Sequence, residues 1–330
     1  MRGRATALVL LGIGAFLVVV ATALPTVLAP ALVKLPLTQE ARSSASGTGL
    51  TIFYPGDLSE HSNVTVSSVR KIAGLAGAPE AGPDTAVWTV GNVLEDSEGV
   101  LVGVTEITAC FDRRTGVAVN PCPSARLNGD DRVRYEGQLF AFPFGTEQHD
   151  YEFFDPNAQR AFPIRFMGVE SIEGIEVYRF QQDIPEIVTG TQEVPGELAG
   201  AAPGSTVEAD LVYQNTRTLW VEPTTGSIMN GREEIHQVMR GPGGTEGVTL
   251  LDGTLNFTPE AITTIAGQVS AGKSQVDLIT RTLPIALGIA GAAALIAGLI
   301  LLLRAPARPV APARRSADAD VTEPHVRQVS

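Results

Sequence analysis

The sequence predicts a mainly β ectodomain of antiparallel curved sheets between two transmembrane α-helices. Residues 5–33 and 282–303 are apolar, and each is long enough to cross a bilayer, which requires ~20 apolar residues in a helix. Residues 35–257 consist largely of alternating and β-branched runs separated by Gly, Pro, Asn and Asp, a pattern typical of strands and turns. A juxtamembrane stalk helix is expected over 258–281, before the second span.

The charges that flank the two spans predict their orientation. Arg2 and Arg4 precede the first span, and Arg304 with further arginines follows the second. Because basic flanks are retained on the cytoplasmic side, both termini should be cytoplasmic and the ectodomain extracytoplasmic, at the plasma membrane. A cleavable signal peptide is the alternative for the first span, since Ala21-Thr22-Ala23 is a small-x-small site. The apolar run continues to Val33, which favours a retained span.

The ectodomain contains nine segments with strand character. Each is rich in β-branched or alternating apolar residues and ends at a turn signal. They are residues 50–54, 64–72, 100–111, 132–142, 176–181, 208–213, 217–222, 232–238 and 248–257. A Gly- and Pro-rich run, GTQEVPGELAGAAPGS, lies between the predicted strands 176–181 and 208–213. It is expected to be a mobile surface loop.

A weak internal repeat suggests that the ectodomain consists of two related half-barrel-like units. The run TACFDRRTGVAVN from Thr108 resembles TLWVEPTTGSIMN from Thr218, about 110 residues later. Each copy is a strand, an acidic residue, a Thr-Gly turn and a second strand, and the glycine supplies the positive φ that a tight turn requires. Chance recurrence of similar hairpins is the alternative, and both interpretations stay open.

The two cysteines of the chain, Cys110 and Cys122, both lie in the ectodomain. An oxidising compartment lets such a pair form a disulfide, and the turn at Arg114-Thr115-Gly116 brings the chain back between them. A disulfide across a hairpin is therefore expected. The spacing is not Cys-x-x-Cys and no histidine lies nearby, so a metal or redox site is disfavoured.

The stalk helix has a clear start signal. Thr258 is a suitable N-cap, Pro259 suits the first helical position, and Glu260 lies near the positive end of the helix dipole. Apolar residues at helical spacing, from Ile262 to Ile279, form one face, which is expected to pack on the ectodomain rather than on the outer leaflet. Residues 304–330 lack apolar periodicity and are expected to form a disordered cytoplasmic tail.

Composition and motifs exclude several functions. The net charge is −12 at pH 7, and the ectodomain is more acidic still because many basic residues flank the spans, so a nucleic-acid partner is excluded. The chain lacks a Gly-x-Ser-x-Gly elbow and a phosphate-binding loop, and none of its four histidines has the spacing of a metal site. The sequence therefore predicts a non-enzymatic protein without catalytic residues, metal or cofactor.

The central part of the ectodomain concentrates the aromatic residues of an otherwise aromatic-poor chain. An ordinary sheet core is one interpretation, since aromatic residues dominate cores. The lining of an apolar cavity that holds an acyl chain is the other. The candidate ligand-binding residues are Phe140, Phe142, Phe144, Phe166, Tyr178 and Phe180.

Several of these motifs together resemble a known family. The run YEFFDPNAQRAFPIRFMGVESIEGIEVYRFQQDIP, with ACFDRRTG upstream and LWVEPTTG downstream, resembles the actinobacterial porin PorA family, and the resemblance covers nearly the whole chain. The phrases MGVESIEGIEVYRF and VEPTTG also resemble β-sheet carriers of the periplasmic lipoprotein-carrier type. That resemblance implies a half-barrel that cradles an acyl chain, although those carriers lack two membrane spans.

Three functions are compatible with these features. The first is a membrane-anchored module that binds or transfers an envelope lipid or lipidated glycan. The second is an oligomeric channel or channel-associated protein, although neither span carries the inward charges that a polar pathway needs. The third is a structural or sensory adaptor, which the lack of an output domain in the tail disfavours.

Overall fold

The computed structural model describes residues 2–304, and the predicted cytoplasmic tail beyond Arg304 lies outside the described residues. Long strands make up the middle of the chain, and apolar helices lie at both of its ends. In chain order they are α1 (Arg2–Ala23), η1 (Leu24–Leu28), α2 (Ala29–Leu32), β1 (Glu40–Tyr54), β2 (Ser59–Gly74), β3 (Thr85–Asp96), β4 (Leu101–Asp112), β5 (Arg126–Leu127), β6 (Tyr151–Asp155), β7 (Arg160–Ile172), β8 (Ile175–Pro195), η2 (Gly196–Ala199), β9 (Thr206–Glu222), β10 (Ser227–Arg240), η3 (Pro242–Gly244), β11 (Glu246–Phe257), α3 (Pro259–Asp277), η4 (Leu278–Thr282) and α4 (Leu283–Arg304).

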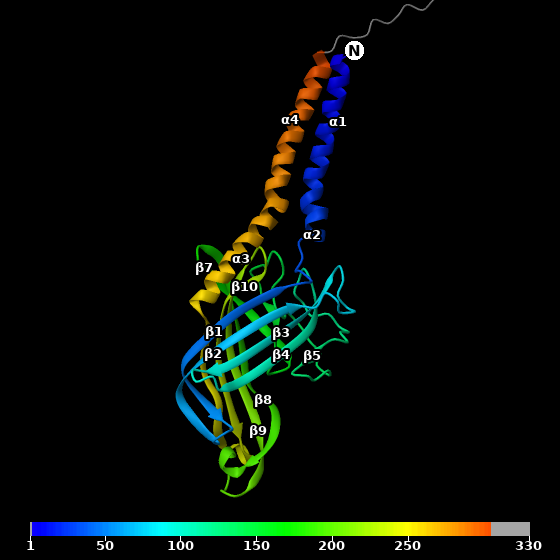
Figure 1. Ribbon diagram of the computed structural model, residues 1–330. Helices are drawn as coiled ribbons and strands as arrows, with labels where there is room; N and C mark the ends of the chain where they lie inside the picture. Colours follow the sequence, from blue (N-terminus) through cyan, green and yellow to red (C-terminus); the bar gives the residue numbers. More distant parts are fainter. Residues whose placement is uncertain (1, 305–330) are drawn as a thin grey trace, which may run out of the picture. The chain divides into compact units, whose positions relative to one another are not determined.

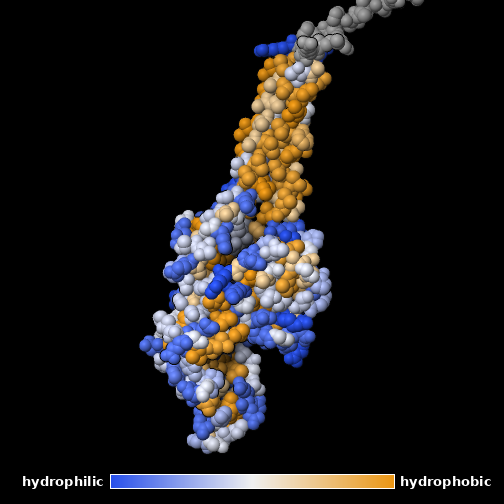
Figure 2. Space-filling model, viewed as in Figure 1, coloured by the Kyte–Doolittle hydropathy of each residue, from blue (hydrophilic) through white to orange (hydrophobic). Residues whose placement is uncertain are grey.

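The chain divides into two compact units, which we describe separately. Among the described residues one unit contains 2–20 and 286–304, and the other contains 21–285. The first is a pair of antiparallel apolar helices in close contact: a Cβ built on Gly291 of α4 would lie 3.0 Å from the Gly14 carbonyl oxygen of α1, and one built on Gly298 would lie 3.0 Å from that of Ala7. Small residues permit such an approach between membrane helices. Figure 2 shows their outer surface as almost continuously apolar.

These helices have the length and composition of membrane spans. The helical segments Arg4–Leu28 and Pro259–Arg304 are both long and apolar enough to cross a bilayer. Large apolar side chains such as Phe16 and Ile289 are exposed on them, as expected for surfaces that lipid covers. Both predicted spans are thus present as helices.

The second unit is built on one sheet of eleven strands in the order β5-β4-β3-β2-β1-β11-β10-β9-β8-β7-β6. Every neighbouring pair is antiparallel. The first and last strands of the unit, β1 and β11, pair at its centre, so the sheet has an early half and a late half. It curls into a half-barrel (Figure 1), and the two halves share one continuous sheet rather than forming separate units.

The irregular segment 132–142, which we call the bridging segment, connects the two edges of this sheet at one end. Gln138 forms a bridge with Val117, next to β4, and a second bridge with Phe153 of β6. The Gln138 N–H donates to the Glu152 carbonyl at 2.7 Å, and the Phe154 N–H donates to the Gln138 carbonyl at 2.9 Å. The half-barrel is therefore closed at this end by a single backbone segment.

The structure corrects several predicted strands. Residues 132–142 were expected to form a strand, but they are irregular, with Gln138 alone in bridges. Their backbone groups bond to different elements, for example Phe142 N–H to the Gly226 carbonyl, so no single ladder forms. The predicted loop over residues 190–205 was also too long, because β8 continues to Pro195. Strands β3, β5, β6 and β7 were missed.

The stalk helix is present as predicted, and its apolar face packs on the sheet. The Thr258 side chain caps α3 by accepting from the Ala261 N–H at 3.2 Å. Val269 and Ala266 are buried in a cluster with Val177 of β8 and Met229 of β10. Apolar burial against the sheet therefore stabilises the packing of this face, by roughly 25 cal/mol per Å² of area removed from water.

Candidate ligand-binding site

The inside of the half-barrel contains a cavity of about 240 Å³, which we call the inner cavity. Its walls come from both halves of the sheet, because side chains on alternate positions of a strand point to the same face. Ile107 of β4 contributes from the early half and Leu219 of β9 from the late half, while Leu139 of the bridging segment covers one side. The curl of the sheet thus produces an internal, mainly apolar space.

A second hollow of about 460 Å³, which we call the outer groove, adjoins the inner cavity. It lies between the start of β1, the segment before it and helix α3, with Ile265 and Val269 of α3 on one wall. The two spaces share five lining residues: Ser43, Arg70, Phe140, Ile228 and Phe257. Their junction is therefore at the inner side of β1 and β2.

The charges along the outer groove are one-sided. Lys34, Arg42 and Arg70 line it, and no Asp or Glu is among its lining residues in the described chain. Lys34 pairs with Asp84 at 2.8 Å. No ion pair involves Arg42 or Arg70 within residues 2–304. In a chain of net charge −12, such a surface favours an anionic group.

A buried polar network forms one wall of the inner cavity, centred on Arg217 of β9. Arg217 Nη2 donates to Asp155 Oδ2 at 2.9 Å, and its Nε donates to Glu233 Oε1 at 2.6 Å. Its Nη1 donates to Gln182 Oε1 at 2.7 Å. The Tyr213 hydroxyl donates to Asp155 at 3.0 Å. Burial alone would lower the pKa of Arg217, but the charges of Glu233 and Asp155 outweigh it and raise that pKa.

Arg70 of β2 differs from Arg217 in its hydrogen bonding. Its Nε is buried without a hydrogen-bond partner, and no other side-chain hydrogen bond of Arg70 occurs among the described residues. Burial, and then the positive charge of Arg217, lower the pKa of Arg70 to about 10, with Glu233 opposing the shift. Glu233 itself bonds to Arg217 and Asn215. Arg70 is therefore a cation held without a partner at the junction of the two hollows.

The six predicted aromatic residues do not form one lining. Phe140 lies at the junction, and Phe144 lines the outer groove. Phe142 and Phe180 are fully buried in a core cluster, against which Phe166 and Tyr178 pack. Phe140, Phe142 and Phe144 do not share the face of a strand, because this segment is irregular. Phe140 joins Trp88 and Phe111 in a different cluster.

Sequence reasoning missed Arg70 and Arg217, although a signal for Arg70 was present. Arg70 has the same strand parity as Val66 and Ser68, which are both buried. A charged residue on the inward parity of a predicted strand indicates a buried charge that needs a partner. For Arg217 the partners come from β6, β8 and β10, and the sequence alone does not bring these strands together.

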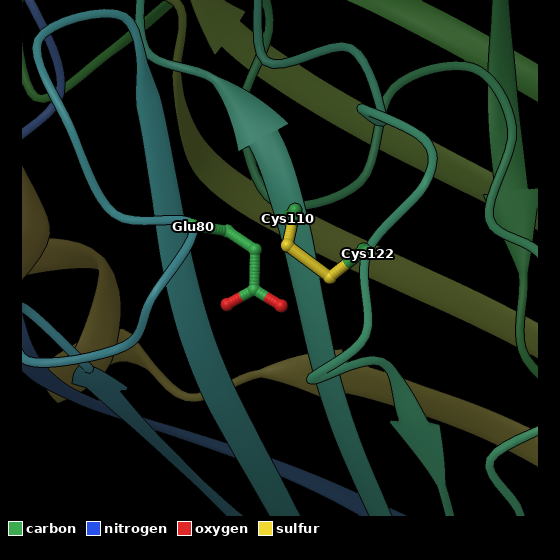
Figure 3. A group of neighbouring side chains, drawn as sticks. All are labelled: Glu80, Cys110 and Cys122. Atoms are coloured by element: carbon green, nitrogen blue, oxygen red, sulfur yellow. A yellow bond between two sulfur atoms is a disulfide. The ribbon is translucent and has the colours of Figure 1, made fainter.

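The predicted disulfide is present between Cys110 of β4 and Cys122. Glu80 lies beside it (Figure 3). Because both sulfurs are bonded to each other, neither is a thiolate that could bind a metal. The Glu80 carboxylate accepts instead from the Ser124 backbone and hydroxyl, both at 2.9 Å. The three residues form a structural staple of the β4–β5 loop.

The fold and its hollows define a membrane-anchored half-barrel protein with an internal cavity. A sequence model of the family described as Porin PorA matches residues 6–300, so the chain belongs to the Porin PorA family. The predicted resemblance is thus confirmed. A porin is typically not an enzyme, in agreement with the non-enzymatic interpretation.

Two proteins named Porin PorA are similar to this chain. The one from Corynebacterium amycolatum is 28% identical over 149 residues of alignment, and the match covers 38% of this chain and 39% of that protein. The one from Corynebacterium resistens (strain DSM 45100 / JCM 12819 / GTC 2026 / SICGH 158) is 26% identical over 195 residues, 42% of this chain and 47% of that protein. The chain spans less than half the length of these relatives.

Proposed function

We propose that the protein binds an amphiphilic envelope lipid, or the lipid part of a lipidated glycan, inside the half-barrel. The observation that carries this proposal is the continuity of the inner cavity with the outer groove through five shared lining residues. Ligand pockets usually enclose ~300–1,000 Å³ with mainly apolar walls and a few polar groups. The two hollows together fall in this range. Non-enzymatic retention or transfer of a lipid suits such a space.

We further propose that the ectodomain is extracytoplasmic and that both termini are cytoplasmic. This orientation is supported by two basic residues, Arg4 at the start of α1 and Arg304 at the end of α4, because basic flanks are retained in the cytoplasm. A cytoplasm-active reporter fused after Leu303 should therefore be active, and the same reporter inserted in the β5–β6 loop should be inactive. The reverse pattern would overturn the orientation.

Filling the inner cavity tests lipid binding directly. Ala45 of β1 lines this cavity, whereas Ala73 of β2 is exposed. Full-length protein purified in a mild nonionic detergent should retain lipid, as seen by native mass spectrometry. Ala45→Trp should reduce the lipid-bearing fraction strongly, because the indole occupies the space, and the matched control Ala73→Trp should leave it unchanged. Wild-type protein without any retained or added lipid would contradict the proposal.

A channel is the second candidate, and the family description favours it. Two helices per chain can surround a pore only in an oligomer. Between its ends, α4 contains no charged residue, and polar pathways across membranes generally use such residues. Stepwise conductance of the reconstituted full-length protein would support the channel. The Ala45→Trp variant should then conduct equally, because a pore between helices does not depend on the inner cavity.

A further inference from the structure

The strongest unexplained feature is the positive charge at the junction of the two hollows. Arg70 is held there by the long β2 strand, between the inner cavity and the outer groove, whose charged lining residues within 2–304 are all basic. Arg70 is half-buried, with its Nε buried and without a partner, and proteins normally pair or neutralise a charge that is withdrawn from water. Within the described residues the nearest acidic side chain that lines either hollow is Glu233, and two other residues already bind it.

The surroundings of Arg70 suit an anionic group with an apolar tail. Ser43 and Ser44 of β1 line the same wall and offer hydroxyl groups. The inner cavity beyond is walled by apolar side chains such as Leu139, Phe153 and Leu219. The main charged group on its wall is Arg217, whose guanidinium already donates to other side chains of its own network. The lining therefore changes from cationic in the outer groove to mainly apolar in the inner cavity, with Arg70 between the two.

Building on the proposed function, we infer that the lipid is an anionic amphiphile whose carboxylate or phosphate oxygens bind the Arg70 guanidinium. The acyl chain extends into the inner cavity, and the outer groove, with Arg42 and Lys34 along it, admits the anionic head group. A guanidinium presents several N–H donors in a planar fork that matches carboxylate and phosphate oxygens. The ligand thus supplies the partner that the fold does not.

The test uses full-length protein in nonionic detergent, with lipid removed, and native mass spectrometry to measure the bound fraction. Four probes separate the head-group charge from the chain: palmitate, dipalmitoylphosphatidylglycerol, and their uncharged counterparts 1-hexadecanol and dipalmitoylglycerol. Arg70→Met removes the charge at similar volume, and Arg70→Lys restores it. The matched control is Arg165→Met, on the exposed side of β7.

Wild-type protein should bind at least one anionic probe about 10- to 100-fold more tightly than its uncharged counterpart, as expected for hydrogen bonds to a charged group. Arg70→Met should remove this preference while leaving 1-hexadecanol binding intact, Arg70→Lys should restore part of it, and Arg165→Met should behave like the wild type. Preference for palmitate alone identifies a carboxylate head group, and preference for phosphatidylglycerol alone a phosphate.

Two negative outcomes have different meanings. If anionic and uncharged probes bind equally, or if Arg70→Met keeps the preference, the head-group inference is overturned and lipid binding stands. If no probe binds the wild-type protein, lipid binding itself is overturned, and the head-group inference falls with it. Binding of 1-hexadecanol by Arg70→Met shows that the variant is folded, so that loss of palmitate binding reports on charge.

Discussion

Arg70 and Arg217 lie on the wall of the same cavity, yet their surroundings are opposite. Arg217 donates to two carboxylates and a buried amide, whereas Arg70 has a buried Nε without a partner. Removing one partner from a buried ion pair leaves an uncompensated charge, which is strongly destabilising. Removing a charge that has no partner leaves nothing unpaired. The two arginines should therefore respond differently to the same substitution.

Arg217→Met should lower the free energy of unfolding by about 3–5 kcal/mol, because Asp155 and Glu233 lose their shared partner. Arg70→Met should leave this free energy unchanged or raise it, since a half-buried cation whose Nε has no partner is removed. Denaturant unfolding of the full-length protein in detergent measures both. An equal loss for the two variants would show that Arg70 has a structural role.

At the scale of elements, the two Thr-Gly turns of the internal repeat have the same construction. Asp112 accepts from the Thr115 backbone and hydroxyl at 2.8 and 3.0 Å, and Glu222 accepts from those of Thr225, both at 2.8 Å. Both turns contact the segment that bridges the sheet edges: the Leu139 N–H donates to Gly116 and the Phe142 N–H donates to Gly226. The repeated motif thus positions the bridging segment.

Gly226 should tolerate no side chain. Its φ is +70°, which costs other residues ~1–2 kcal/mol, and a Cβ there would collide with the Phe142 carbonyl oxygen. Gly226→Ala should therefore lower the free energy of unfolding by more than ~2 kcal/mol. Gly145→Ala is the matched control, because Gly145 has a φ of +73° with nothing near its Cβ position. Similar losses for the two variants in thermal unfolding would mean that the close approach is unimportant.

Local signals predicted some elements well and others poorly. The Thr258 cap and the apolar face of α3 are contained within one helix, so the sequence was sufficient for them. The spacing around the Arg114-Thr115-Gly116 turn was sufficient for the disulfide. Residues 132–142 alternate like a strand, but their backbone partners come from other parts of the chain. Strand β3 was missed because Gly91 and Asn92 resemble a turn, although both pair with β2.

At the scale of the whole molecule, the candidate site depends on the curl of the sheet. The inner cavity is lined by β1–β4 of the early half and by β6 and β9–β11 of the late half, and the pairing of β1 with β11 joins these halves. Pairing between strands about 200 residues apart is not encoded in any local pattern. The sequence therefore predicted a curved β ectodomain and its anchors, but placed only Phe140 and Phe144 of six candidate residues at the hollows.

We propose that an acyl chain occupies the inner cavity when the protein is in its membrane. Photocrosslinking in membranes that contain the full-length chain can detect it, with palmitate carrying a diazirine near its methyl end. We expect crosslinks to inner-cavity residues such as Leu139, Phe153 and Leu219, which Ala45→Trp should abolish and Ala73→Trp should not. Crosslinks confined to the apolar helices α1 and α4 in wild-type protein would contradict it.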